Sequence, residues 1–479
     1  MGQAMPTTVI RNIDWIVAHD GSGHHYASGD VAFAGDALVH VAGPYTGVAE
    51  REIDGRGFMV MPGLVNIHSH PASEPLNKGW NDEIGSPKLY NSSLYEIMPL
   101  FRPDKEGVKA SFRVALCEAL MSGVTTLVDL SVAHDGWVDL MADSGMRGVL
   151  GPMYRDARWY TDNGYRVQYE WDEAAGRRAM DQAIGIVEAA QRHPSGRLSG
   201  MVIPSQIDTC SENLLRDSYA EALRLKVPFQ THAAQSIVEF HEMTRRHGMT
   251  PIEWLDSLGV LGPTSIIGHG IFLDHHSATS WPQRDDLGTL IARGATVAHC
   301  PTVFIRRGIT MQTVGGYIRR GVKIGIGTDT YPHNMIEEMR HALYASRIVG
   351  KSVFDLRTSD IFNAATLGGA AALQRDDIGR LAPGAKADLV MVDVTAPSTR
   401  PLRDPIQSLI YAAADRAVRH VFVAGAQVVS DGRVTTMDYA AASLELEETQ
   451  RRVEPMVRQL DWAHRSHAEL SPLVYRRDE

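Results

Sequence analysis

Cysteine and long apolar runs are both scarce in this chain of 479 residues. Only three cysteines occur, Cys117, Cys210 and Cys300, and their odd number and wide spacing argue for a reducing compartment and against a disulfide framework. No segment approaches the ~20 consecutive apolar residues of a membrane span. The first 20 residues lack the pattern of a signal peptide. We therefore expect a cytoplasmic protein with no membrane partner.

A basic excess is also missing, because the net charge is −10, and this argues against a nucleic-acid partner. No phosphate-binding loop of the GxxxxGK[ST] type is present either. The remaining composition, 44% apolar and 22% charged residues, is ordinary for a globular protein. A chain of this length can bury a large core and form more than one domain.

The two ends of the chain differ from its middle in the length and spacing of their apolar runs. Residues 1–60 and 376–436 hold short apolar runs separated by Gly and Asp, which predicts one small composite β-sandwich domain. Residues 61–375 alternate eight apolar runs with amphipathic segments, which predicts an α/β fold with a parallel sheet. We expect a (β/α)8 barrel of the TIM type, with an open doubly wound sheet as the alternative. Residues 437–479 are predicted to form a helical tail.

Histidine and aspartate residues stand at the ends of several predicted strands. His68 and His70 are two residues apart, so both side chains leave a strand on the same face. His232, His269 and Asp329 each end a further apolar run. In a barrel these ends open on one face, where imidazoles and a carboxylate suit Zn²⁺ and also Fe²⁺, Co²⁺ or Mn²⁺.

These strings make the chain resemble the amidohydrolase superfamily, in the branch of cytosine deaminase-like and atrazine chlorohydrolase-like enzymes. A looser similarity, in residues 74–80 and 90–95, points to molinate or phenylurea hydrolase-like members. The resemblance covers nearly the whole chain and is carried by residues 62–70, Ser122-Gly-Val-Thr-Thr, His299-Cys-Pro, Gly327-Thr-Asp and residues 379–390.

The resemblance implies a role for each matching position. One divalent metal ion per subunit, zinc in the first instance, would be bound by His68, His70, His232 and Asp329. Asp329 would also take a proton from the attacking water, and His269 would polarise the substrate. His299 is a further candidate for proton transfer.

One position departs from the pattern of the deaminases in this branch. They carry His-x-x-Glu after the fifth strand, whereas this chain has His232-Ala-Ala-Gln235. A glutamine forms hydrogen bonds but cannot relay a proton. Glu239 lies one helical turn further on, where support of the helix is the favoured role and that of a substitute acid the alternative. We therefore predict hydrolysis of an amide, urea or carbamate C–N bond, with deamination or dehalogenation of a heterocycle as the alternative and a non-catalytic binding protein as a remote one.

The substrate pocket is less clearly marked. An apolar or aromatic small molecule is the expected partner, and a homo-oligomer is the expected assembly. Packing of the loops is the favoured explanation for the same aromatic residues. The candidate substrate-binding residues are Trp80, Tyr90, Arg158, Trp159 and Phe304.

Overall fold

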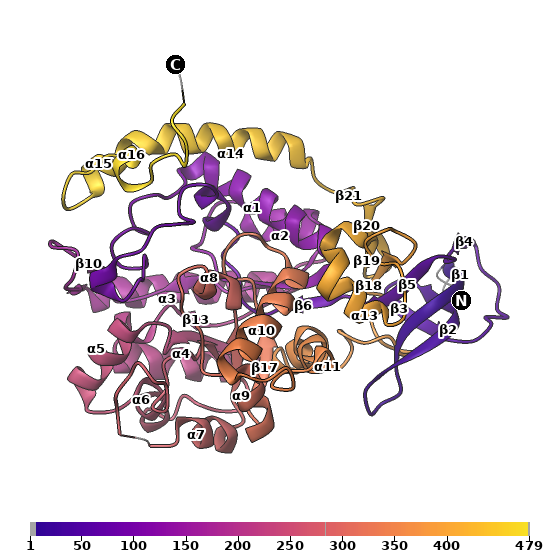
Figure 1. Cartoon of the computed structure of the whole chain (residues 1–479), viewed down its shortest axis with the longest axis horizontal. Coiled ribbons are helices and arrows are strands. Elements are labelled where there is room, and N and C mark those ends of the chain that lie inside the picture. Colours follow the sequence, from indigo (N-terminus) through magenta and orange to yellow (C-terminus); the bar gives the residue numbers. More distant parts are fainter. Residues whose placement is uncertain (1–5, 283, 478–479) are drawn as a thin grey trace.

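The computed structural model describes residues 6–282 and 284–477 (Figure 1). Parallel strands and helices fill the middle of the chain, a β-sheet from both chain ends lies to one side, and a helical tail crosses the top of the view. The first five residues of the predicted small domain and the last two of the predicted tail lie outside the described residues. No helix in the described part of the chain is long and apolar enough to cross a membrane.

Two four-stranded parallel sheets form the core of the middle region. The first has the order β12-β8-β7-β6 and the second the order β14-β15-β16-β17. Their bounds are β6 (Leu64–Asn66), β7 (Val124–Asp129), β8 (Arg147–Leu150), β12 (Leu198–Gly200), β14 (Phe229–Ala233), β15 (Ser265–His269), β16 (Thr296–His299) and β17 (Lys323–Ile326). These strands coincide with the eight apolar runs of the sequence.

Backbone contacts join the two sheets at both of their seams. At one seam Val202 pairs with Phe229 in a parallel bridge, next to the short strands β9 (Met153–Tyr154) and β13 (Ile203–Pro204). At the other, Ser69 pairs with Asp329, and the Ile67 amide donates to the Ile326 carbonyl oxygen at 3.1 Å. The carboxyl ends of strands from both sheets therefore face one common space.

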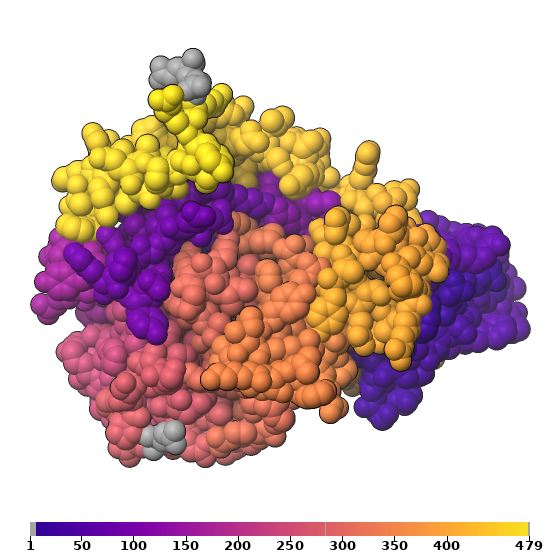
Figure 2. Space-filling model, viewed as in Figure 1, coloured from indigo at the N-terminus to yellow at the C-terminus, as the bar shows by residue number. Residues whose placement is uncertain are grey.

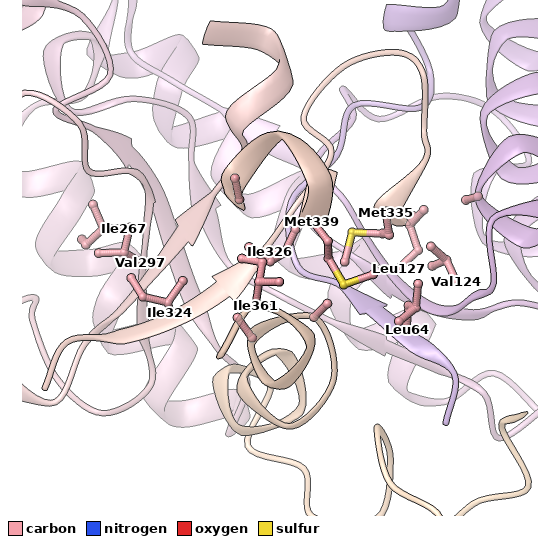
Figure 3. Packing of buried hydrophobic residues seen from close by; sticks show 14 of the residues in the cluster. Leu64, Val124, Leu127, Ile267, Val297, Ile324, Ile326, Met335, Met339 and Ile361 are labelled. Atoms are coloured by element: carbon pink, nitrogen blue, oxygen red, sulfur yellow. The ribbon is translucent and has the colours of Figure 1, made fainter. Parts of the chain in front are cut away.

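Helices cover the strands on the outside. Several begin at a side chain that accepts a hydrogen bond from the first turn, as Asp104 does from the Gly107 amide at 2.8 Å. The longest are α1 (Lys105–Met121), α3 (Glu173–Gln191), α4 (Glu212–Leu225), α5 (Ile237–His247) and α10 (Met335–Gly350), with the shorter α2 (Trp137–Asp143), α6 (Pro251–Ser257), α7 (Asp286–Arg293), α9 (Val314–Arg320) and α11 (Thr358–Asn363) between them. Figure 3 shows buried strand residues packed against Met335, Met339 and Ile361.

Strands from the two chain ends form one nine-stranded sheet. Its path is β21-β20-β19-β18-β5-β1-β2-β3, and β4 pairs with β1. Strands four positions apart in a flat sheet lie about 19 Å from each other, yet Phe33 on β2 and Phe422 on β19 have ring centroids only 5.6 Å apart. The sheet is thus continuous and folds over itself. The bounds are β1 (Thr7–His19), β2 (His24–Ala34), β3 (Ala37–Val41), β4 (Arg51–Asp54), β5 (Phe58–Pro62), β18 (Leu389–Asp393), β19 (Val418–Val423), β20 (Ala426–Ser430) and β21 (Arg433–Val434).

The C-terminal tail is helical and lies against the middle region. It contains α14 (Tyr439–Val453), α15 (Val457–Leu460) and α16 (His467–Leu470). Helix α14 packs along α1, and Figure 2 shows the yellow tail resting on the purple segment of the chain.

A buried ion pair connects the nine-stranded sheet to the strands of the middle region. Arg147 on β8 donates from Nε and Nη2 to the two carboxylate oxygens of Asp388, at 2.8 and 2.9 Å. Both side chains are almost fully buried. The Ala424 amide donates to the same carboxylate at 2.8 Å. Since an unpaired buried charge is costly, each partner requires the other.

We predict that Asp388→Ala lowers the free energy of unfolding by about 3–5 kcal/mol, because it leaves the Arg147 guanidinium buried and unpaired. Urea denaturation measures the loss. The matched control is Glu170→Ala, which breaks the exposed pair with Arg158 and is expected to cost at most about 1 kcal/mol. Equal losses in the two variants would contradict the prediction.

Candidate metal centre

Four side chains predicted from the sequence converge at the carboxyl ends of the strands. One potential ligand atom from each of His68, His70, His232 and Asp329 lies within 4.8 Å of the others. The first two follow β6, the third lies on β14, and Asp329 follows β17. Asp329 has a φ of 58°, and its backbone is held by hydrogen bonds with His68 and His70 at 2.8 and 3.0 Å.

The three imidazoles are oriented by hydrogen bonds at their Nδ1 atoms. His70 Nδ1 donates to the Leu130 carbonyl oxygen at 2.7 Å, and His232 Nδ1 donates to that of Ser205 at 2.5 Å. His68 Nδ1 lies 2.5 Å from Gln230 Oε1. Because these oxygens only accept, the proton of each ring is on Nδ1 and the lone pair is on Nε2.

The free Nε2 atoms face one another and the carboxylate. Nε2 of His70 lies 3.2 Å from Nε2 of His232, and Asp329 Oδ1 lies 3.2 Å from Nε2 of both His68 and His70. Two nitrogen lone pairs at this distance repel each other unless a cation lies between them. A donor set of three imidazoles and one carboxylate fits a divalent metal ion of the zinc type.

The protonation states also suit a metal ion. Burial disfavours the ionised form of Asp329, but the surrounding histidines outweigh burial and hold the pKa of its carboxyl well below the usual range. Burial, helped by the neighbouring imidazoles, lowers the pKa of His232 well below its ordinary value. The site therefore offers an ionised carboxylate and a neutral imidazole at neutral pH.

His269 and His299 lie beside these four residues and are available for other contacts. Burial lowers the pKa of each to about 3, so both rings are neutral. Among the described residues, Nδ1 of His269 and Nε2 of His299 have no hydrogen-bond partner. His269 packs edge-on against Phe304 with ring centroids 4.8 Å apart. Cys300 Sγ approaches His68 and His269, but that group shares His68 with the first set.

Gln235 and Glu239 lie just beyond His232 in the chain. The Glu239 carboxyl accepts hydrogen bonds from the backbone amides of Ala234 and Gln235, at 2.6 and 3.4 Å. It thereby fixes the turn after β14, which gives it a structural role. The Gln235 side chain is buried, and its Nε2 has no hydrogen-bond partner in the described part of the chain.

Two residues of the site were missed in the sequence. Gln230, which orients His68, stands two residues before His232 on the same strand. Side chains two apart on a strand point to the same face, so this spacing was a signal that Gln230 faces the site. Glu74 is 6% exposed, and its backbone amide donates to the His70 carbonyl oxygen at 3.2 Å. Burial raises the pKa of Glu74 to about 7, with opposing effects from His70 and Asp329. A carboxylate in the loop directly after His-x-His was the available signal.

The predicted substrate-binding residues are spread over several environments. Phe304 lies beside His269, and with His299 it lines a small, largely apolar cavity. Trp80 is buried between Phe101 and His467, which gives it a packing role. The other three lie further along the loops: Tyr90 is partly exposed near Phe272, Trp159 packs against Tyr95, and Arg158 is exposed and paired with Glu170.

We predict that Gln230→Leu lowers the affinity for the metal ion by about 10- to 100-fold, because His68 loses the acceptor that fixes its ring. Titration against a competing chelator, followed by elemental analysis, measures the change. Gln182→Leu, at an exposed position on α3, is the matched control. Unchanged affinity in the Gln230 variant would show that the bond does not orient the ligand.

Comparisons with known proteins agree with this arrangement. Residues 59–428 match the Amidohydrolase family. The chain is 30% identical over 451 residues to the 5-methylthioadenosine/S-adenosylhomocysteine deaminase of Natronomonas pharaonis, covering 93% of this chain and 95% of the relative.

Two solved structures share the fold. A zinc-bound adenosine deaminase from Xanthomonas campestris has a TM-score of 0.79 and 23% identity, over 94% of this chain and 99% of that one. The zinc complex of atrazine chlorohydrolase from Arthrobacter aurescens TC1 has a TM-score of 0.76 and 19% identity, over 92% and 100%. These neighbours imply a TIM barrel with a separate domain. The predicted family is confirmed: the chain is a member of the amidohydrolase family, a metal-binding hydrolase of carbon–nitrogen bonds other than peptide bonds.

Proposed function

We propose that the protein is an aminohydrolase that releases ammonia from a purine-type heterocycle. The observation that carries this proposal is the 30% identity, along 93% of the chain, to a deaminase of adenosine derivatives. The sequence alone favoured amide-type cleavage, with deamination as the alternative. The similarity to this relative favours deamination instead. The hydrolysed bond is a C–N bond in both cases.

In this proposal one divalent ion, zinc in the first instance, is held by His68, His70, His232 and Asp329. Such an ion, when bound, lowers the pKa of coordinated water toward neutrality and so supplies hydroxide. Asp329 accepts the proton of the attacking water at its carboxylate. His269, whose Nδ1 has no hydrogen-bond partner among the described residues, binds the ring atom on which negative charge develops.

Deamination also needs a group that delivers protons to the ring and to the departing amine. The Gln235 amide cannot deliver protons. The Glu239 carboxyl already accepts hydrogen bonds from two backbone amides. Glu74 is a second buried carboxyl group within electrostatic reach of Asp329 and His70. We propose that Glu74 carries the proton that the missing glutamate carries in related deaminases. A donor of this kind works best when its pKa is near the working pH.

Hydrolysis of an amide, urea or carbamate is the second candidate. Gln235 favours it, because such a leaving amine needs one proton and no relay to a ring nitrogen.

We further propose that the two parallel sheets form one closed eight-stranded barrel, since backbone contacts cross both seams. Assembly as a homo-oligomer and location in the cytoplasm stay predictions from the sequence.

We predict that the metal-loaded enzyme replaces the exocyclic amine of a purine nucleoside by oxygen and releases ammonia. A panel of purines, amides, ureas and carbamates, scored by ammonia assay and product mass, measures this. Asp329→Asn is the inactive control, and Gln235→Glu tests whether a second acid accelerates the reaction. Cleavage of amides, ureas or carbamates, with no ammonia from any purine, would reject deamination in favour of the second candidate.

We predict that Glu74→Gln lowers kcat by about 10²- to 10⁴-fold, the usual contribution of a general acid, without loss of the metal ion. Steady-state kinetics and elemental analysis together measure the two effects. Glu83→Gln, an exposed carboxylate on the same loop, is the matched control and should keep full activity. Full activity in the Glu74 variant would assign the proton to Asp329 alone.

A further inference from the structure

The loop between β6 and α1, residues 71–104, begins directly after His70 and contacts segments that follow other strands around the metal centre. We call it the lid. Tyr95 of the lid bonds through its hydroxyl to Ser236 Oγ at 2.9 Å, in the segment after β14. Two arginines that follow β16 donate hydrogen bonds to the lid: Arg306 to Asp82 at 3.0 Å and Arg307 to Ser93 at 3.1 Å.

These partners of the lid belong to segments that follow different strands. Further ring contacts join Tyr95 to Trp159 on β10 (Ala157–Tyr160) and Tyr90 to Phe272 after β15, with centroids 5.1 and 5.9 Å apart. The lid therefore contacts the segments that follow several strands of both parallel sheets. Glu74 lies near the start of the lid, where its backbone amide donates to the His70 carbonyl oxygen, so the position of its carboxyl group depends both on this bond and on how the lid beyond it is held.

The C-terminal tail holds the lid from its outer side. Gln450 donates to the carbonyl oxygens of Leu76 and Lys78, at 2.8 and 3.2 Å, and Ser471 donates to that of Trp80 at 2.7 Å. A shared apolar cluster combines lid residues with tail residues: Leu76, Trp80, Ile97 and Phe101 with Leu446, Val453, Val457 and Leu470. Figure 1 shows the tail helices lying over this part of the chain.

One charged contact is central to this attachment. Glu96 of the lid is 6% exposed, and it accepts hydrogen bonds from Trp462 Nε1 at 2.9 Å and from Arg465 at 2.8 Å. Arg465 also pairs with the fully buried Asp461 of the tail at 2.7 Å. A buried carboxylate is stable only when it is paired and hydrogen-bonded. The partners of Glu96 both come from the tail.

We propose that residues 439–471 act as a positioning element that holds the lid closed over the metal centre through the Glu96–Arg465 contact. The consequence for catalysis rests on the proposed function, because it requires Glu74 to deliver a proton. The consequence for the lid does not, since it concerns only how firmly residues 71–104 are held. A tail that merely stabilised the whole fold would affect the strands as much as the lid.

Hydrogen–deuterium exchange of the full chain, read by mass spectrometry, separates these cases. In Arg465→Met we expect about tenfold faster exchange in the lid, because Glu96 loses a charge-assisted bond. Exchange in β15 and the content of metal ion should not change. Arg458→Met, which breaks an exposed ion pair within the tail, is the matched control. Arg465→Met also leaves the Asp461 carboxylate of the tail unpaired. The double variant Arg465→Met/Glu96→Gln should therefore recover part of the protection in the lid, because it removes the unpaired charge on the lid side of the contact.

Two results would overturn the proposal: unchanged exchange in the lid, or equal acceleration in the lid and β15. Kinetics on an active substrate add a second readout, in which Arg465→Met is expected to lower kcat while the metal ion remains bound. If no purine is deaminated, the exchange result still decides the role of the tail. Failure of the proposed function and failure of this inference are thus distinguishable.

Discussion

The site depends on three imidazoles that are held with their unprotonated nitrogens facing one point. Each ring is fixed by an Nδ1 proton given to an oxygen, in two cases a backbone carbonyl. The resulting Nε2 atoms repel one another in the absence of a cation. The folded backbone holds them close together despite this repulsion, and a bound metal ion would remove it. The orientation of the three metal-binding histidines therefore depends on the hydrogen bonds that their Nδ1 atoms make.

These hydrogen bonds also tie the site to the strand arrangement. The acceptor for each ring lies on, or just after, a different strand from the histidine itself: Leu130 follows β7, Ser205 follows β13, and Gln230 lies on β14. For His70 and His232 the geometry consequently depends on the parallel register of neighbouring strands, since β6 pairs with β7 and the segment after β13 pairs with β14. A shift of one residue in either pairing would turn an acceptor or a ligand to the other face. The contact between His68 and Gln230 instead joins strands of the two different sheets.

Local patterns predicted the strands and the four converging residues because each depends on short spacing. His68 and His70 alternate along one strand, and His232 and Asp329 end apolar runs. Glu74 lies in the loop after the strand of His68 and His70, where no strand or helix period indicates which side chain turns toward the centre, so its closeness to His-x-His was the only signal. The tail was predicted as helical, but its attachment to Glu96 joins residues more than 350 positions apart and leaves no local pattern.

The loss of an acid at position 235 changes which part of the molecule can control the reaction. A glutamate at that position would be fixed by the turn after β14, which Glu239 holds rigidly through two backbone amides. A proton donor at Glu74 is held instead by its backbone bond to the His70 carbonyl oxygen and by the contacts of the lid that continues from it. The contact between the buried Glu96 and the partly exposed Arg465 then has a role beyond stability, since apolar packing could attach the tail equally well. Under this proposal, the substitution of glutamine for glutamate and the helical tail are parts of one arrangement.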